Sequence, residues 1–229
     1  MSKTSGKIAV IIYGPPGSGK GTQAKLLADE FNLFHFDTGD YLRAMFYGHQ
    51  KLTKELQKEK KINEAGGLNT PSWVLKIVSQ RINHLAELGQ SIILSGSPRT
   101  LYEAFGDKAH GGIIKLLSKK YGRENVHVVI LQIPENESIK RNSMRSSCSV
   151  CKTSFLSNIS GISTCPICGG KIEHRKDDKK EIVTARLKEY HKRTEPIFSE
   201  LRKNKYNVVK INGTPAPYKV HRQIVEYFK

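Results

Sequence analysis

A glycine-rich segment near the N-terminus joins an apolar run, Ile8–Tyr13, to an amphipathic stretch, and this order predicts a strand, a loop and a helix. The loop reads Gly14-Pro15-Pro16-Gly17-Ser18-Gly19-Lys20-Gly21-Thr22. In such a loop the backbone N–H groups surround a phosphate chain, and the helix N-terminus adds its partial positive charge. The spacing therefore predicts a nucleoside triphosphate site, and it disfavours the alternative of an ordinary glycine–proline turn.

The side chains at the end of the loop refine this prediction. Lys20 would reach the β- and γ-phosphate oxygens, and a hydroxyl just beyond it would bind Mg²⁺. In this chain Gly21 follows the lysine, so the hydroxyl comes one step later, at Thr22. The predicted triphosphate-binding residues of the loop are Gly17, Ser18, Gly19, Lys20, Gly21 and Thr22.

Length and hydropathy limit the class of protein. With 229 residues, the chain suits one domain with insertions. Residues 1–7 lack the regions of a signal peptide, and no apolar stretch reaches the ~20 residues of a membrane helix. We therefore expect a cytoplasmic protein with no membrane partner. We also expect a monomer, because the predicted helical and insertion faces account for most apolar positions.

The formal net charge of +17 allows two interpretations. One is binding to nucleic acid or to another acidic surface. The other is a lysine-rich solvated surface with arginines gathered around phosphate substrates. The lysines are scattered and are not interleaved with aromatic residues, as base stacking would require. We favour the second interpretation and expect no nucleic-acid partner.

All four cysteines lie in one short window, as two C-x-x-C pairs separated by thirteen residues: Cys148, Cys151, Cys165 and Cys168. In a cytoplasmic chain this spacing indicates tetrahedral thiolate ligation of zinc rather than disulfides. A [2Fe–2S] site or a reversible disulfide pair is the alternative. Four thiolates would close the zinc shell and leave no open position, so we expect a structural metal.

Short apolar runs alternate with helical stretches along the chain, which predicts parallel strands with crossover helices. The predicted strands are Ile8–Tyr13, Phe34–Phe36, Ser91–Ser95, Val126–Ile133 and Asn207–Ile211. The predicted helices are Gly21–Phe31, Trp73–Leu88, Ile113–Tyr121, Asn136–Met144, Lys180–Leu201 and Pro217–Phe228. The fold class is thus a three-layer α/β/α domain with a central parallel five-stranded sheet, whose ligands bind at the carboxyl ends of the strands.

Two stretches interrupt this alternation and are interpreted as insertions. Residues 38–69 are polar and helical, whereas residues 145–177 hold the cysteines and show no helical period. The core domain would then consist of residues 1–37, 70–144 and 178–229.

Arginines gather at the strand ends and insertion borders of this predicted fold. They are Arg43, Arg99, Arg141, Arg145, Arg175 and Arg186. Phosphoryl transfer needs positioning and charge neutralisation more than covalent chemistry, and planar guanidinium groups hold phosphate oxygens in fixed geometry. Each arginine alone could be a solvated surface residue, but the whole set indicates a phosphoryl-transfer site.

The chain resembles an adenylate kinase of the long-lid kind, whose lid carries a four-cysteine zinc module. The similarity covers nearly the whole length. It rests on residues 14–22, Thr38-Gly-Asp-Tyr-Leu-Arg43, Gly96-Ser-Pro-Arg-Thr100, Arg141-x3-Arg145, the two cysteine pairs, Arg175-Lys-Asp-Asp178, Arg186 and Asn212-Gly-Thr214. The resemblance implies Mg²⁺-dependent, reversible transfer of the γ-phosphate of ATP to AMP, which gives two molecules of ADP.

The resemblance also implies a role for each matching residue. Lys20 and the loop amides would hold the ATP phosphates, Thr22 would reach Mg²⁺, and Arg141 would pack against the ATP base. The residues implied for the acceptor AMP are Thr38, Arg43, Gly96, Arg99 and Glu103. The residues implied for catalysis are Lys20, Arg99, Arg145, Arg175 and Arg186. Residues 38–69 would be the acceptor-binding flap and residues 145–177 the lid, stiffened by zinc; closing both would exclude water.

The chain departs from the family pattern Asp-Gly-Phe-Pro-Arg-Thr, because it has Ser95 in place of the aspartate and Ser97 in place of the aromatic residue. The missing aspartate ordinarily helps to fix the water shell of Mg²⁺. We therefore expect weaker metal binding or slower turnover, unless another carboxylate such as Asp37 or Asp40 substitutes. Ser97 removes apolar bulk near the acceptor pocket.

A further departure is Glu103, at a position where the family has a glutamine that reads the edge of adenine. An ionised carboxylate only accepts hydrogen bonds, so it suits the two adjacent donors of guanine better than adenine. AMP remains the leading acceptor, and a relaxed or GMP-leaning acceptor site is the alternative. A protonated Glu103, or one turned to solvent, would restore adenine.

Other functional classes fit the sequence less well. A zinc-ribbon nucleic-acid-binding ATPase would need more basic residues in the cysteine segment than Lys152 and Lys171. A GTPase-type switch would need an Asn-Lys-x-Asp motif, which the sequence lacks. A degenerate family member with residual activity is a last alternative, and it follows from Ser95.

Overall fold

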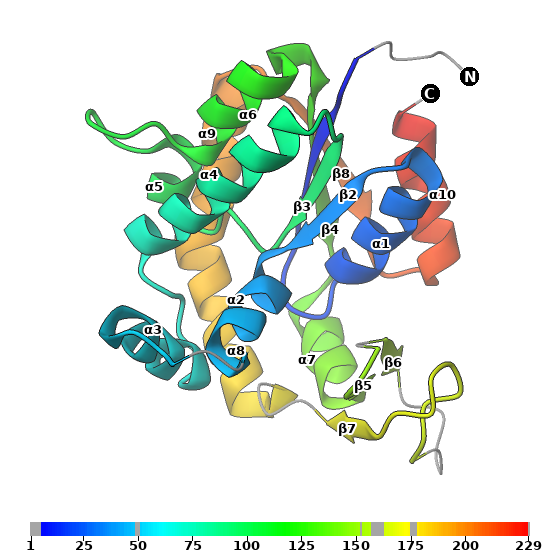
Figure 1. The fold of residues 1–229 in the computed structure, drawn as a ribbon. Coiled ribbons are helices and arrows are strands. Elements are labelled where there is room, and N and C mark those ends of the chain that lie inside the picture. Colours follow the sequence, from blue (N-terminus) through cyan, green and yellow to red (C-terminus); the bar gives the residue numbers. More distant parts are fainter. Residues whose placement is uncertain (1–5, 49–50, 152, 157–162, 175–177, 229) are drawn as a thin grey trace.

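The computed structural model describes residues 6–48, 51–151, 153–156, 163–174 and 178–228. In these ranges helices cover both faces of a central parallel sheet of five strands, as the sequence predicts (Figure 1). The strands are β1 (Ala9–Tyr13), β2 (Phe34–Asp37), β3 (Ile92–Ser95), β4 (Val126–Gln132) and β8 (Asn207–Asn212). Their spatial order is β2-β3-β1-β4-β8, and each neighbouring pair is parallel.

Two apolar clusters fill the space between the sheet and its covering helices. The covering helices are α1 (Lys20–Phe31), α4 (Pro71–Glu87), α6 (Ile113–Tyr121), α9 (Glu195–Lys203) and α10 (Pro217–Tyr227). On one face α4, α6 and α9 pack against sheet residues such as Ile11 and Val128. On the other face α1 and α10 pack against Ile12 and Val129. Successive strand residues point to opposite faces, so strands buried on both faces are apolar throughout. This confirms the three-layer prediction.

Two segments project from the edge of the sheet at which the parallel strands end (Figure 1). One holds the helices α2 (Thr38–Tyr47) and α3 (Lys54–Glu64), in agreement with its predicted helical character. The other holds a three-stranded antiparallel sheet formed by β5 (Arg145–Cys148), β6 (Ser154–Leu156) and β7 (Ile172–His174). These strands are short and largely polar, so they give no apolar alternation by which the sequence could predict them.

The helix predicted over Lys180–Leu201 is interrupted in the structure. It consists of α8 (Lys180–Glu189) and α9, joined by a π-helical turn over Tyr190–Thr194. Pro196 at the start of α9 has no N–H to donate, and this interrupts the regular α-helical hydrogen-bond pattern. The short helix α5 (Leu101–Phe105) was not predicted, and α7 (Glu135–Ser143) lies within one residue of its prediction. No helix in the described ranges has the length and apolar character that crossing a bilayer requires.

Candidate active site

In the loop between β1 and α1, a side chain at either of two glycines would come too close to neighbouring atoms. Gly17 has a φ of +73°, and a Cβ there would lie 2.6 Å from Asn142 Nδ2. A Cβ on Gly14 would lie 2.8 Å from the carbonyl oxygen of Leu131. The hydroxyl of Ser18 is buried inside this loop, and no described residue is hydrogen-bonded to it. A ligand in the loop could therefore satisfy a polar group that the described residues leave unpaired.

Lys20 is the first residue of α1 and its ammonium group lies within the loop. Its Nζ donates hydrogen bonds to the carbonyl oxygens of Gly14, at 2.7 Å, and Pro15, at 2.8 Å. Burial holds the pKa of Lys20 well below its usual range, and the positive charges of three arginines lower the pKa further: Arg99, Arg186 and Arg145. The structure thus brings together, around one buried lysine, guanidinium groups from three distant parts of the sequence. A polyanion is the natural partner for such a cluster.

Arg145, the first residue of β5, is held by a carboxylate. Its Nε and Nη2 donate to the two carboxylate oxygens of Asp178, at 2.9 and 2.5 Å. Asp178 precedes α8 and is buried, so this ion pair ties the first residue of β5 to the chain just before α8. The predicted site residue Arg175 lies outside the described residues. Arg186 lies within α8.

The predicted base-contacting residue Arg141 lies on α7 and is fixed at three points. Its Nε donates to Glu137 Oε1 at 2.6 Å, and its Nη1 and Nη2 donate to the carbonyl oxygens of Gly213 and Thr214 at 2.9 and 2.6 Å. Two of these three contacts are with carbonyl oxygens of the loop that follows β8, so the edge of the guanidinium group lies against that loop. This loop contains the Asn212-Gly-Thr214 segment, one of the motifs that carry the family resemblance.

On the acceptor side, three of the predicted residues lie next to one another. A Cβ on Gly96 would lie 3.4 Å from Arg99 Nη2 and 3.6 Å from Thr38 Cβ. The Thr38 hydroxyl is buried without a hydrogen-bond partner among the described residues. Arg43 lies one helical turn further along α2, where its Nη2 is 2.5 Å from Asp40 Oδ1. The carboxyl ends of β2 and β3 thus present a hydroxyl and a guanidinium group to the same space.

Glu103 is buried and turned toward its own segment. Its Oε2 accepts from the backbone N–H of Arg99 at 2.8 Å, and its Oε1 accepts from the Thr100 hydroxyl at 3.0 Å. Thr100 in turn caps α5 by accepting from the Glu103 N–H. Burial is the main influence on the pKa of the Glu103 carboxyl, which is raised. The side chain is therefore not turned to solvent, and its predicted contact with the acceptor base stays a prediction.

Because of this geometry, glutamine and leucine at position 103 should affect stability differently. In Glu103→Gln the amide oxygen can accept from Arg99 N–H while the amide nitrogen donates to Thr100 Oγ1, so we expect an unfolding temperature close to wild type. In Glu103→Leu both hydrogen bonds are lost and the donors stay buried, at a cost of about 1–3 kcal/mol. Differential scanning calorimetry of both variants measures this; equal melting temperatures for the two would contradict the contacts described.

The four cysteines form one cluster in the second inserted segment. The Sγ atoms of Cys148 and Cys168 are 3.4 Å apart, those of Cys151 and Cys165 are 3.7 Å apart, and all four lie within 4.8 Å of one another. Four sulfurs around a tetrahedral zinc would lie about 3.8 Å apart, given Zn–S bonds of about 2.3 Å. The donor set therefore fits a zinc ion in number, chemistry and spacing.

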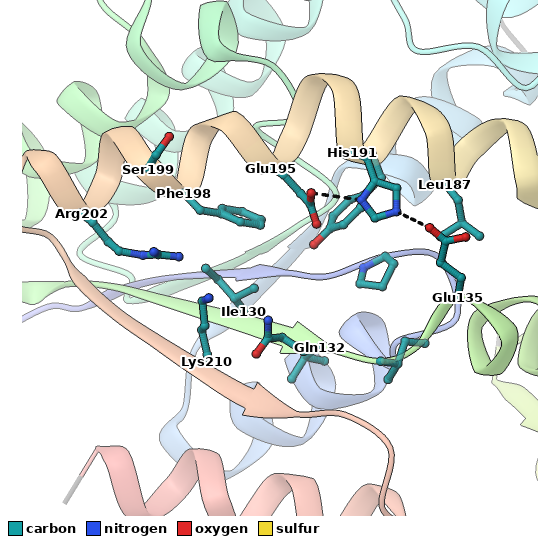
Figure 2. Close-up of a pocket in the computed structure, with 14 residues that line it drawn as sticks. Ile130, Gln132, Glu135, Leu187, His191, Glu195, Phe198, Ser199, Arg202 and Lys210 are labelled. Carbon is teal, nitrogen blue, oxygen red and sulfur yellow. Dashed lines mark ion pairs between the residues drawn. The ribbon is translucent and has the colours of Figure 1, made fainter.

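A hollow of about 330 Å³ lies beneath the α8–α9 connection, beside Pro15 of the loop (Figure 2). Its lining includes Ile130 of β4 and, facing it, Phe198 of α9. At its rim His191 bridges two carboxylates, with Nε2 3.0 Å from Glu135 Oε1 and Nδ1 3.0 Å from Glu195 Oε2 (Figure 2). The bridge ties the start of α7 to the π-helical turn after α8. No pattern in the sequence indicates this bridge, because Glu135 and His191 are far apart along the chain.

This bridge predicts a pH-dependent contribution to stability. The Glu195 hydrogen bond is the main cause that raises the pKa of His191, so the folded protein binds the proton more tightly than the unfolded chain. The stabilisation is complete below the unfolded pKa of about 6.5 and is lost as pH rises through the folded pKa. We therefore expect His191→Gln to lower the melting temperature more at pH 6 than at pH 8.5. An equal difference at the two pH values would show that the bridge does not depend on the imidazolium.

Comparison with known proteins agrees with this geometry. Residues 12–206 match the family model described as adenylate kinase. The adenylate kinase of Petrotoga mobilis is 36% identical over 210 residues, which cover 89% of each chain. That of Methanothrix thermoacetophila is 37% identical over 194 residues, 82% of this chain and 84% of the relative. That of Borrelia turicatae is 35% identical over 222 residues, 95% of this chain and 97% of the relative.

Proposed function

Because the chain belongs to the adenylate kinase family, we propose that the cationic cluster around Lys20 carries out the family's reaction in this protein. That reaction is the reversible transfer of the γ-phosphate of ATP to AMP, which gives two molecules of ADP. The observation that carries the assignment to these residues is the placement of Lys20 within the loop, where the positive charges of Arg99, Arg145 and Arg186 lower its pKa. The comparisons do not favour the alternative of a nucleic-acid-binding ATPase.

On the donor side, the loop amides and Lys20 hold the phosphates of ATP. The ammonium group exchanges its contacts with Gly14 and Pro15 for phosphate oxygens, and the unpaired Ser18 hydroxyl gains a partner. Thr22, exposed in the first turn of α1, offers a hard oxygen to Mg²⁺. Arg141, held by the loop after β8, packs against the base.

On the acceptor side, Thr38, Gly96 and Arg99 form the wall of the AMP site, with Arg43 from the next turn of α2. Arg99 already lies against the carbonyl oxygen of Gly96, to which its Nε donates at 2.6 Å, so its orientation is set before AMP binds. Such pre-organisation reduces the entropy lost when the phosphate is held. Glu103 accepts from the Arg99 N–H and the Thr100 hydroxyl, and only the lone pairs that these contacts leave would be open to the acceptor base.

Transfer itself requires neutralisation of charge on the moving phosphoryl group. Arg145 and Arg186 supply it, together with Arg175 from the returning lid segment. Mg²⁺, held through Thr22, would supply further neutralisation of the triphosphate charge. The Asp178 carboxylate orients Arg145 through two hydrogen bonds, and the guanidinium turns part of its edge to phosphate on closure.

The two inserted segments close over the core during the reaction. We assign residues 38–69 to the acceptor-binding flap, residues 145–177 to the lid, and residues 1–37, 70–144 and 178–229 to the core. Closure excludes water, which would otherwise hydrolyse ATP. The four cysteines bind zinc, which stabilises the lid and takes no part in chemistry. A monomer in the cytoplasm, without a nucleic-acid partner, is the form we propose.

An acceptor panel tests the function. ADP formation from Mg·ATP is measured with AMP, GMP, CMP, UMP and dAMP, for the wild type and for Glu103→Gln as the matched variant. We expect AMP to be the best acceptor. If the Glu103 carboxylate reads the base, Glu103→Gln raises the AMP-to-GMP ratio of kcat/KM by about 5- to 150-fold. A wild-type kcat/KM for AMP at least a hundredfold above that for GMP would reject the GMP-leaning alternative. Absence of transfer to every acceptor would contradict the proposed activity.

A further inference from the structure

The carboxyl ends of β2 and β3 carry a carboxylate and a hydroxyl side by side. Asp37 and Ser95 are direct partners in the parallel register of the two strands. The Ser95 hydroxyl donates to Asp37 Oδ2 at 2.9 Å, and His35 Nε2 lies 2.8 Å from the Ser95 oxygen. Because the serine proton is used toward Asp37, the histidine nitrogen is the donor in the second contact. The three side chains therefore form one chain of hydrogen bonds that ends on the carboxylate.

The orientation of the Asp37 carboxylate is fixed at both oxygens. Oδ1 accepts from the backbone N–H of Asp40 at 2.9 Å and so caps α2, while Oδ2 accepts from Ser95. Each carboxylate oxygen has a second lone pair available for a further donor. The negative charge of Asp37 also acts on Lys20, the residue proposed to hold the phosphates. Asp37 is thus an oriented carboxylate within electrostatic reach of the triphosphate loop.

Asp40, the other candidate from the sequence, is placed differently. Its Oδ1 is paired with Arg43 Nη2 at 2.5 Å, and its side chain is 54% exposed. It lies in the first turn of α2, one turn away from the sheet edge. An exposed carboxylate already paired with a guanidinium contributes little to a metal site at the phosphate loop.

We propose that Asp37 is the metal-positioning carboxylate of this enzyme, and that it holds the water shell of the Mg²⁺ bound to ATP from β2, with Ser95 on β3 orienting it. The inference rests on the proposed function of the loop. P-loop proteins hold this ion with a loop hydroxyl and a strand-end aspartate, and hard oxygen ligands are what Mg²⁺ requires. Here Ser95 stands at the end of β3, where the aspartate was expected, and Asp37 stands across from it at the end of β2.

The test compares ATP binding with and without metal. Isothermal titration calorimetry measures the affinity of the full-length enzyme for ATP, without acceptor, in Mg²⁺ and in excess EDTA. Asparagine is as good a helix cap as aspartate, so Asp37→Asn removes the charge and keeps the cap. Asp40→Asn is the matched control on the same turn. Melting temperatures of all variants are recorded alongside.

We expect Asp37→Asn to reduce the Mg²⁺-dependent gain in ATP affinity by about tenfold, the effect typical of losing an outer-shell partner. In EDTA the same variant should bind ATP as well as or better than the wild type, because a negative charge near the phosphates is gone. A merely structural role would weaken binding in both conditions. Asp40→Asn should leave the gain unchanged.

A double variant, Asp37→Ser with Ser95→Asp, moves the carboxylate back to β3 and should restore the gain. An unchanged gain in Asp37→Asn, or a loss in Asp40→Asn instead, would overturn the inference. Absence of any gain in the wild type would also overturn it, and the acceptor panel would then decide separately whether the proposed function stands.

Discussion

Replacing Lys20 by methionine is expected to lower kcat by about 10²–10³-fold, the usual cost of removing one electrostatic donor from a transition state. The stability of the protein, in contrast, is expected to change little. In the folded protein the ammonium group is buried among the charges of Arg99, Arg186 and Arg145, and this repulsion offsets its two hydrogen bonds to the loop carbonyls. The melting temperature of Lys20→Met should therefore stay within a few degrees of wild type while activity is lost.

Coupled ADP production and calorimetry measure the two effects on the same sample. Lys25→Met is the matched control, since Lys25 lies on the same helix and is exposed. It should change neither kcat nor melting temperature appreciably. A Lys20→Met variant that retains more than a tenth of wild-type kcat would contradict the proposed contact with the phosphates.

The second large effect is expected from Cys165→Ser. Cys165 is buried in the four-cysteine cluster, and a structural site of this kind contributes its metal-binding free energy to folding. Loss of one thiolate should release the metal and unfold the small sheet that begins at Arg145. We expect bound zinc to fall well below one per chain and the melting temperature to fall by about 5–10 °C, which is about 2–3 kcal/mol for a chain of this size. Turnover should fall at least about tenfold, because Arg145 loses its position.

Mass spectrometry measures the bound zinc, calorimetry measures the melting temperature, and limited proteolysis detects unfolding of the small sheet. Val150→Ser is the control: Val150 lies between two of the ligands and is 65% exposed, so its replacement leaves the thiolates in place. A Cys165→Ser protein that keeps a full complement of zinc, or a wild type whose stability is unchanged by a zinc chelator, would contradict a structural metal site.

Much of the fold could be predicted because its signals lie within single segments. The glycine spacing from Gly14 to Gly19 and the doubly buried strands, such as Val126–Gln132, are visible as short patterns. Both depend on local rules, namely the backbone freedom of glycine and the alternation of strand side chains. The antiparallel sheet beginning at Arg145 escaped prediction because its short polar strands carry no such pattern.

The candidate site also has features that the sequence predicts and features that it does not. The sequence by itself determined the phosphate loop, the parallel sheet, the paired cysteines and the set of arginines, since each follows from residue types at fixed spacing. Only the tertiary structure decided that Asp37 lies against Ser95, that Glu103 turns toward Arg99 N–H, and that His191 joins Glu135 to Glu195. Asp37 and Ser95 are 58 positions apart. Their contact depends on the register of the two neighbouring strands β2 and β3, and this register is fixed by packing of the whole core.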